Sequence, residues 1–236
     1  MELRAGQVAV VTGATGDLGR ALARRLAAEG LRVVLADTEE EPLRALADEL
    51  IAGGAELLAR TVDVGERAEV EALAGAAYDT FGAVHVLCNN AGTGRGAPGP
   101  LWEHDPADWR RSFEANVLGV LHGVRCFLPR MVASGEPGHV VNSAAADGGC
   151  APSGAASVPA ATGAAVVALT ETLRAQLAAA GAPVGASVLV PGPYALDGAG
   201  PPASPAAVAE VAGRVVAGIR GGRFWIRPPG AGAEAE

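Results

Sequence analysis

The sequence predicts an α/β fold in one domain, with a parallel sheet of about seven strands covered by helices on both faces. Apolar runs of strand length alternate with segments of helix length, the connections between them are short, and no internal repeat or interdomain linker is present. Strands joined through helices form parallel sheets by right-handed crossovers. With 236 residues, 50% of them hydrophobic, the chain can bury the core of one such domain.

The alternation gives the expected elements in chain order. We expect strands near 7–12, 31–36, 56–62, 84–89, 138–143, 184–190 and 223–226. Helices are expected near 17–29, 39–52, 66–81, 107–133, 160–180 and 205–220. The domain is assigned to 1–227. Residues 228–236 are rich in Pro, Gly, Ala and Glu and are predicted to be a disordered tail.

The turn after the first strand has the composition of a phosphate-binding loop. Four apolar residues, Val8 to Val11, are followed by a glycine-rich turn and by a helix that begins near Asp17. At such a junction the backbone N–H groups and the positive end of the helix dipole face an anion, as in dinucleotide-binding βαβ units. The sequence therefore predicts a pyrophosphate cradle here.

An acidic residue follows the second expected strand. Asp37 lies about twenty residues after the glycines, where a carboxylate accepts hydrogen bonds from a ribose diol. Glu39, Glu40 and Glu41 add negative charge that would repel a 2′-phosphate, so the sequence favours NAD over NADP. The alternative is a surface acidic turn that caps the helix at 40–50.

Charge and composition exclude several classes of function. The net charge of −8 and the pI of about 5.1 argue against partners that need a basic surface, namely nucleic acids and anionic membranes. All 18 basic residues are arginine. A coding sequence biased toward G and C is the simplest explanation for the missing lysine, but the absence also bears on chemistry below.

Cysteines and chain ends favour a cytoplasmic protein. Cys88, Cys126 and Cys150 are odd in number and lack C-x-x-C spacing, so we expect neither a disulfide framework nor a metal site. The chain begins without a long apolar segment, and no apolar run reaches transmembrane length.

Motifs beyond the glycines give a specific resemblance. Asn89-Asn90-Ala91-Gly92 resembles the N-N-A-G signature of the short-chain dehydrogenase/reductase family, and Asp63-Val64 is similar to its adenine-contacting pair. Asn116 matches the asparagine that supports a catalytic water in relatives, and Pro191-Gly192 resembles the nicotinamide-side turn. The resemblance extends from Gln7 to Ile226 and implies a Rossmann-type doubly wound sheet. It implies cofactor contacts from Gly13, Thr15, Gly16, Asp17, Leu18, Gly19, Asp37, Asp63, Val64, Asn90, Ala91, Gly92, Pro191 and Gly192.

The catalytic positions of the family are replaced. Relatives carry a Ser after the fifth strand and Y-x-x-x-K on the next helix, where the Tyr exchanges a proton and the Lys lowers its pKa. The Ser position falls on Ala145, and the Tyr and Lys positions fall on Pro159 and Gly163. A slip of one residue places Val158 and Thr162 there instead. Neither alignment supplies a proton donor of useful pKa, so we expect the usual relay to be lost.

The glycine loop also departs from the commonest family pattern. Asp17 stands where many relatives have glycine, although Gly13, Gly16 and Gly19 fit the G-x-x-G-x-x-G spacing of extended members. A carboxylate beside bound phosphates is unfavourable, and we therefore expect NAD to be bound weakly or not at all. Alternatively, Asp17 only stabilises the start of the helix.

Four residues are candidates for replacing the relay. Asp147 and Tyr194 follow the fifth and sixth strands at the ligand-binding edge of the sheet, and Asn116 and Ser143 are hydrogen-bonding groups. A carboxyl group in an apolar pocket has a raised pKa and suits general acid or base work. The alternative for Asp147 is a solvated turn residue before two glycines. Cys150 is a poorer candidate because no cationic residue adjoins it.

Three functions remain open. The main hypothesis is a non-redox acid/base enzyme, cyclase- or isomerase-like, that acts on a small organic substrate of secondary metabolism. The alternatives are a non-catalytic homologue that binds a ligand or partner, and an ordinary NAD-dependent oxidoreductase. Small residues on the helix at 160–180, together with the helix at 107–133, resemble the family's subunit interface and imply a homodimer or homotetramer. These small residues are Ala161, Ala164, Ala165 and Ala168.

Overall fold

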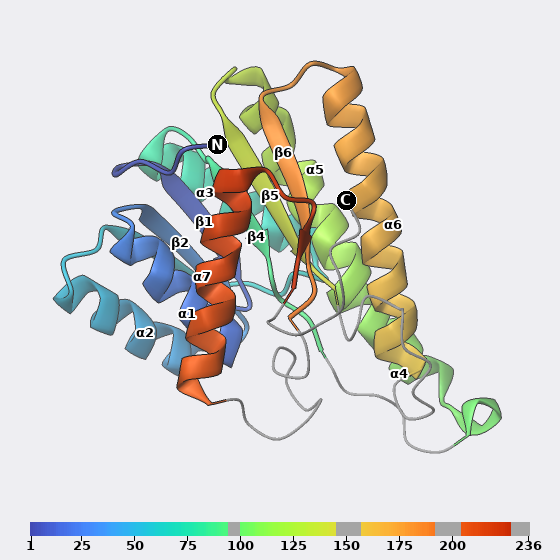
Figure 1. Cartoon of the computed structure of the whole chain (residues 1–236). Coiled ribbons are helices and arrows are strands. Elements are labelled where there is room, and N and C mark those ends of the chain that lie inside the picture. Colours follow the sequence, from blue (N-terminus) through green and yellow to red (C-terminus); the bar gives the residue numbers. More distant parts are fainter. Residues whose placement is uncertain (94–99, 145–156, 192–203, 228–236) are drawn as a thin grey trace.

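A single parallel sheet organises the chain. The computed structural model describes residues 1–93, 100–144, 157–191 and 204–227. Within these ranges seven strands lie in the order β3-β2-β1-β4-β5-β6-β7, and each neighbouring pair is parallel (Figure 1). The predicted fold class is confirmed. The strands are β1 (Val8–Thr12), β2 (Arg32–Asp37), β3 (Leu57–Thr61), β4 (Val86–Asn89), β5 (Gly138–Ser143), β6 (Val184–Leu189) and β7 (Trp225–Ile226).

Helices cover both faces of the sheet. One face carries α1 (Asp17–Ala28), α2 (Glu40–Ala52) and α7 (Pro205–Gly221). The other carries α3 (Arg67–Phe81), α5 (Gly119–Ala133) and α6 (Ser157–Ala179). Side chains of β1 alternate between the two layers: Ala9 and Val11 join the core under α1 and α7, while Val8 and Val10 join the core under α3 and α5. Burial on both faces explains why β1 is apolar without interruption.

The strand order reverses beside β1. The chain builds β2 and β3 on one side of β1, then crosses to place β4 and all later strands on the other side. Loops leaving the carboxyl ends of β1 and β4 therefore diverge, and ligands of doubly wound sheets bind in the crevice that results. The sequence motifs named above lie on these loops.

The helix expected at 107–133 is present and contains a π-helical turn. It consists of α4 (Pro106–Phe113), a π-helical turn η2 (Glu114–Leu118) and α5. Single π-turns occur within helices frequently at functional sites, and this one contains Asn116, which is 4% exposed. The sequence pattern did not indicate this π-turn.

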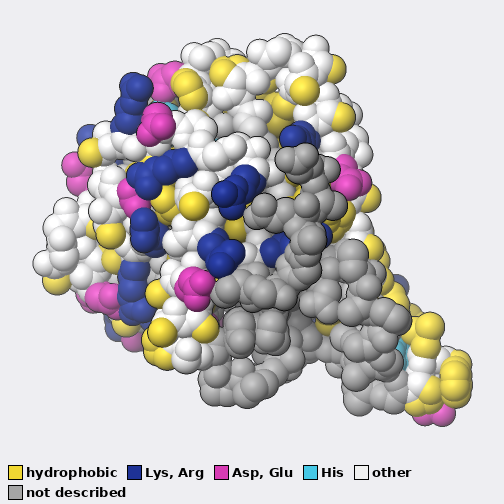
Figure 2. Space-filling model, in the orientation of Figure 1, with side chains coloured by type: hydrophobic (Ala, Val, Ile, Leu, Met, Phe, Trp, Pro, Cys, Tyr) yellow, Lys and Arg dark blue, Asp and Glu magenta, His cyan; other side chains and the backbone are white. Residues whose placement is uncertain are grey.

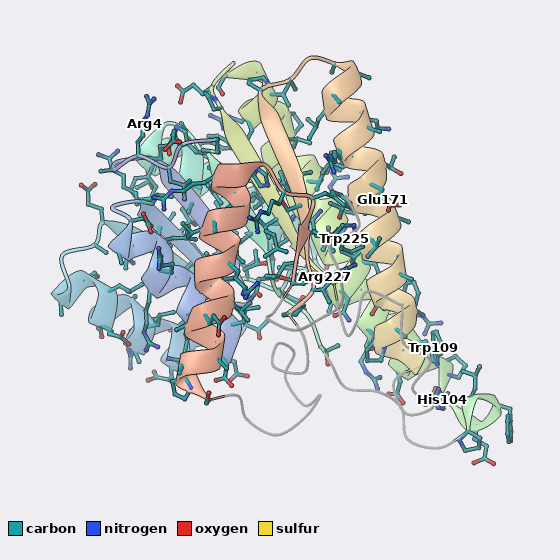
Figure 3. The ribbon with its side chains drawn as sticks, in the orientation of Figure 1. Arg4, His104, Trp109, Glu171, Trp225 and Arg227 are labelled. Carbon is teal, nitrogen blue, oxygen red and sulfur yellow. The ribbon has the colours of Figure 1, made fainter. Side chains whose placement is uncertain are left out.

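A short projection precedes α4. Residues Leu101–Glu103 form a 3-10 turn, η1, which extends with α4 from the body of the molecule (Figure 1). The Asp105 side chain caps α4 by accepting a hydrogen bond from the Ala107 N–H at 2.8 Å. Trp109 Nε1 donates to His104 Nδ1 at 3.4 Å, and the two rings lie together on this projection (Figure 3). These contacts assign residues 104–109 to the start of a helix.

Candidate functional site

Two glycines allow the backbone of the β1–α1 turn to pack closely. Gly13 has φ +62°, and a Cβ there would lie 2.7 Å from Ala91 Cα. A Cβ on Gly19 would lie 1.9 Å from the carbonyl oxygen of Gly13. At the start of α1, Gly16 occupies the N-cap position and no side chain caps the first turn. N–H groups at this end can therefore be offered to an anion, together with the positive end of the helix dipole.

Asp37 lies next to this turn, at the end of β2. Its Oδ2 accepts a hydrogen bond from the Thr15 N–H at 2.8 Å, and its Oδ1 accepts one from the Thr38 N–H at 2.7 Å. On the other side of the turn, Arg20 Nε donates to the Thr15 carbonyl at 2.7 Å. Thr15 is thus held at both its N–H and its carbonyl, so Asp37 and Arg20 together fix the shape of the glycine turn.

A cleft opens between the glycine turn and the loops after β3 and β4. It has a volume of about 720 Å³, which includes solvent at its mouth. Most of the residues expected to contact a cofactor share it. The lining residues are Gly13, Gly16, Gly19, Asp37, Thr38, Val62, Asp63, Val64, Asn90, Ala91, Gly92, Thr93 and Ala115.

Backbone and side-chain contacts hold the Asp63-Val64 wall of the cleft. Asp63 Oδ1 accepts a hydrogen bond from the Gly65 N–H at 2.8 Å. His122 Nδ1 lies 2.9 Å from the Val64 carbonyl oxygen, and since that oxygen only accepts, Nδ1 carries the proton and donates. Gly119 makes room for Val64: a Cβ on Gly119 would lie 2.7 Å from Val64 Cγ2.

Asn90 joins the glycine turn to β5. Its Nδ2 donates to the carbonyls of Thr12 and Gly13 at 3.1 and 3.2 Å, and its backbone N–H donates to Thr12 Oγ1 at 3.0 Å. The Ser143 hydroxyl donates to Asn90 Oδ1 at 3.3 Å and is 9% exposed. Ser143 is therefore a buried support for the cleft.

Asn116 joins the loop after β4 to two helices. Its Oδ1 accepts from the Thr93 N–H at 2.7 Å, and its Nδ2 donates to the Thr93 carbonyl at 2.9 Å. The same Nδ2 donates to Thr162 Oγ1, on α6, at 3.1 Å. Both hydrogen-bonding groups of the Asn116 side chain are therefore used within the protein.

The structure places other predicted residues away from the cleft or outside the described ranges. Asp17 is exposed and lines a second groove with arginines of α1 and with the first turn of α7. Leu18 is 2% exposed and belongs to the core, and Pro191 is buried at the end of β6. Three predicted site residues lie outside the described residues: Asp147, Tyr194 and Gly192.

Two arginines of the groove that contains Asp17 form ion pairs. Arginine side chains gather over α7 and its neighbouring helices in Figure 2. In the groove, Arg24 pairs with Glu49 and Arg25 with Glu29, both at 2.6 Å. Arg24 and Arg25 thus have carboxylate partners, and both arginine side chains are partly exposed, where an ion pair contributes little.

Other chemistry is limited among the described residues. The Tyr78 hydroxyl is buried and donates to the Phe127 carbonyl at 2.9 Å. Burial raises its pKa to about 12, although the nearby Arg130 guanidinium acts in the opposite direction. The described part of the chain holds no group of three His, Cys, Asp or Glu residues placed to bind a metal ion. Cys88 and Cys126 are free thiols, and none of the described helices is long and apolar enough to cross a membrane.

Sequence reasoning missed three supports of the site: Thr12, Arg20 and Thr162. Each acts through a hydrogen bond to a residue distant from it in sequence or to the turn backbone. The only local signal was the position of Thr12, a polar residue that ends an apolar strand directly before Gly13.

The site geometry defines a class of protein. A glycine turn at the start of α1, an acidic residue at the end of β2 and a cleft at the point of strand reversal are the features of a Rossmann-type dinucleotide-binding fold. More particularly, the chain belongs to the short chain dehydrogenase family, whose model matches residues 7–200.

Known proteins of this family are similar over most of the chain. A 1-deoxy-11-beta-hydroxypentalenate dehydrogenase of Streptomyces avermitilis is 39% identical over 184 residues, which is 78% of this chain and 67% of that protein. A 3beta-hydroxysteroid dehydrogenase 2 of Eggerthella lenta is 35% identical over 62% of this chain and 56% of its own length. The chain thus spans about two thirds or less of these relatives' length. A crystal structure of a short chain dehydrogenase/reductase from Burkholderia phymatum in complex with NAD superposes with a TM-score of 0.87, at 38% identity, over 96% of this chain and 90% of that one.

These similarities correct the main functional hypothesis. The expectation of a non-redox, cyclase- or isomerase-like enzyme is wrong, because the similar proteins are named dehydrogenases and the matching family is that of short chain dehydrogenases. They favour the ordinary NAD-dependent oxidoreductase that had been the alternative. Whether the Ser-Tyr-Lys relay is lost stays a prediction.

Proposed function

We propose that this protein is an NAD(H)-dependent oxidoreductase that interconverts a hydroxyl group and a carbonyl group on a small organic molecule. The observation that carries the proposal is the cleft that brings Gly13, Gly16 and Gly19 together with Asp37. Similarity to dehydrogenases of hydroxylated compounds, and to a structure in complex with NAD, supports it.

The residues of the cleft fit a dinucleotide. Gly13 and Gly19 leave no space for a Cβ, which is the requirement of a turn that packs tightly around a pyrophosphate. The Asp37 carboxylate would accept hydrogen bonds from the adenosine ribose and repel a 2′-phosphate, so NAD is preferred over NADP. Asp17 lies in a different groove, and we therefore propose that it does not weaken NAD binding. When bound, NAD supplies the hydride acceptor, and its reduced form supplies the hydride donor.

The chain's own residues position this chemistry without lysine. Asn116 and Ser143 make their hydrogen bonds within the protein, so we propose that they hold the cleft walls and do not exchange the proton. For the proton, Asp147 and Tyr194 remain our candidates. Asp147→Asn and Tyr194→Phe should each lower turnover at least about tenfold. Full turnover in the double variant would exclude both residues.

Calorimetric titration with NAD⁺ and NADP⁺ tests cofactor binding. Wild-type protein should bind NAD⁺ more tightly. Asp37→Ala should lose about 1.5–3 kcal/mol of NAD⁺ binding, the usual contribution of a hydrogen bond to a charged group, and should narrow the preference over NADP⁺. Asp48→Ala, which removes an exposed carboxylate of α2 outside the cleft, is the matched control. An equal loss in both variants would contradict the role given to Asp37.

Turnover is tested by following NADH absorbance with a panel of hydroxylated cyclic compounds and the corresponding ketones. Dinucleotide-dependent turnover supports the oxidoreductase. Dinucleotide binding without turnover of any compound would favour a non-catalytic, ligand-binding homologue. The absence of lysine from the sequence supports this alternative.

Assembly and location are proposed on the same basis. We propose a cytoplasmic homodimer or homotetramer that associates through α5 and α6, with a small-molecule substrate and with neither nucleic acid nor membrane as partner. Light scattering at micromolar concentration tests the assembly, and a monomeric mass would contradict it.

A further inference from the structure

A buried chain of hydrogen bonds connects α6 to the wall of the cofactor cleft. Thr162 on α6 is 0% exposed, and its hydroxyl donates to the Pro159 carbonyl at 3.1 Å. The same Oγ1 accepts the hydrogen bond from Asn116 Nδ2. Asn116 in turn holds both the N–H and the carbonyl of Thr93, a residue that lines the cleft.

Thr162 supplies the third hydrogen bond that holds the Asn116 amide in place. The two N–H bonds of Nδ2 point to two acceptors, the Thr93 carbonyl and Thr162 Oγ1. Asn116 lies in the π-helical turn η2, and its side chain is almost fully buried. A buried N–H without an acceptor is unfavourable, so removal of the Thr162 oxygen weakens the hold of the amide on the Thr93 backbone.

The same local chemistry recurs two turns later on α6, away from the cleft. Thr170 is 0% exposed, donates to the Val166 carbonyl at 2.7 Å and accepts from Asn142 Nδ2 at 3.0 Å. Asn142 Oδ1 accepts from Asn89 Nδ2 at 2.8 Å. None of these residues lines the cofactor cleft. Thr170 therefore matches Thr162 in burial and hydrogen bonding. The difference is that Asn142, the partner of Thr170, bonds to a residue outside the cleft.

We propose that Thr162 is a positioning residue for the cofactor site: through Asn116 it fixes the backbone of Thr93 and so shapes the cleft wall after β4. The proposal rests on the proposed binding of NAD. Thr162 itself touches neither cofactor nor substrate, because it is wholly buried between α6 and η2.

Two variants differ only in which threonine loses its hydroxyl. Thr162→Val and Thr170→Val keep the side-chain shape and each remove one acceptor of an asparagine N–H. Urea unfolding should report a comparable loss of stability in both. The NAD⁺ dissociation constant should rise at least about fivefold in Thr162→Val and stay within about twofold in Thr170→Val. Thr162→Ser, which restores the hydroxyl, should return the constant to the wild-type value.

Amide hydrogen exchange gives a measurement without cofactor. In Thr162→Val the Thr93 N–H should exchange at least about tenfold faster than in wild type, and in Thr170→Val it should be unchanged relative to global stability. If Thr162→Val does not fold, Thr162→Ala is measured in its place, since alanine is well tolerated in a helix.

The outcomes separate this inference from the proposed function. Wild-type protein that binds no NAD⁺ would refute the cofactor assignment, and the exchange of the Thr93 amide would still decide whether Thr162 controls this wall. Faster exchange together with weaker NAD⁺ binding, both specific to the Thr162 variants, supports the proposal. Equal exchange in the Thr162 and Thr170 variants, or an unchanged NAD⁺ dissociation constant in Thr162→Val where wild type binds, overturns it.

Discussion

His139 should make the stability of the protein depend on pH. The side chain lies on β5, is 2% exposed, and its Nε2 is 2.6 Å from Ser187 Oγ. The Ser187 hydroxyl donates to the Arg223 carbonyl at 2.5 Å, so His139 Nε2–H must be the donor to Ser187. Burial, with a smaller contribution from the N-terminal ammonium, lowers the pKa of His139 from 6.5 to about 4.

The direction in which pH changes the stability follows from proton binding in the folded and unfolded states. Below pH 6.5 His139 binds a proton in the unfolded chain but stays neutral in the folded chain. The free energy of unfolding therefore falls as the pH falls toward 4. At pH 5 the unfolded form is almost fully protonated and the folded form is almost fully neutral. The free energy of unfolding should therefore be lower at pH 5 than at pH 7.5 by about 2 kcal/mol from this residue alone.

Urea unfolding of wild type and His139→Gln at pH 7.5 and pH 5 measures this contribution. The glutamine does not titrate, and all other groups are common to both proteins, so the pH-dependent loss should be smaller in the variant by about 2 kcal/mol. His104→Gln removes a histidine from the projecting segment and controls for the loss of one histidine. Identical pH dependence in wild type and His139→Gln would refute the reasoning.

Four further substitutions follow from the geometry of the site and of the helices around it. Gly19→Ala should lower the free energy of unfolding in urea by more than the about 1–3 kcal/mol that overpacking usually costs, because its Cβ would lie 1.9 Å from the Gly13 carbonyl oxygen. Gly75→Ala on α3, where a Cβ would have nothing within 4 Å, should instead raise the free energy of unfolding by about 0.5–1 kcal/mol in the same assay. Gly123→Ala would press on Asn89 Oδ1 at 2.1 Å and should lower the thermal midpoint while the folded fraction still binds NAD⁺ normally, as titration calorimetry would show. Asp17→Asn should change the NAD⁺ dissociation constant by less than about twofold, and a tenfold gain in affinity would show that the carboxylate does oppose binding.

The fold was accessible from the sequence because each strand of a sheet buried on both faces is a short, continuous apolar run. Such runs and the helices between them placed every described strand within two residues of its predicted start. The helix expected over 107–133 is present, but the sequence did not indicate the π-turn within it. A π-turn adds one residue without changing local composition.

The candidate site was predictable where backbone conformation dictates residue type. Gly13, Gly19 and Asp37 take part in the cleft because a tight turn and a strand end require them there. Asp17 lines a different groove from these residues, and spacing alone does not tell on which side of a helix start a side chain lies. Thr162 was considered only as a substitute for lysine, and its bond to Asn116 arises from tertiary packing.

The π-turn η2 also determines how α4 and α5 are phased about their common axis. Each residue of an α-helix advances the side-chain direction by about 100°. Deleting one residue from Glu114–Leu118 would let the helix run regularly, and it would rotate every side chain of α5 by that angle relative to α4. Gly123 would then leave the place beside Asn89 that only a glycine fits, and His122 would turn away from Val64. A single-residue deletion here would thus act on many contacts at once, and in this helix the number of residues is constrained as strictly as their identity.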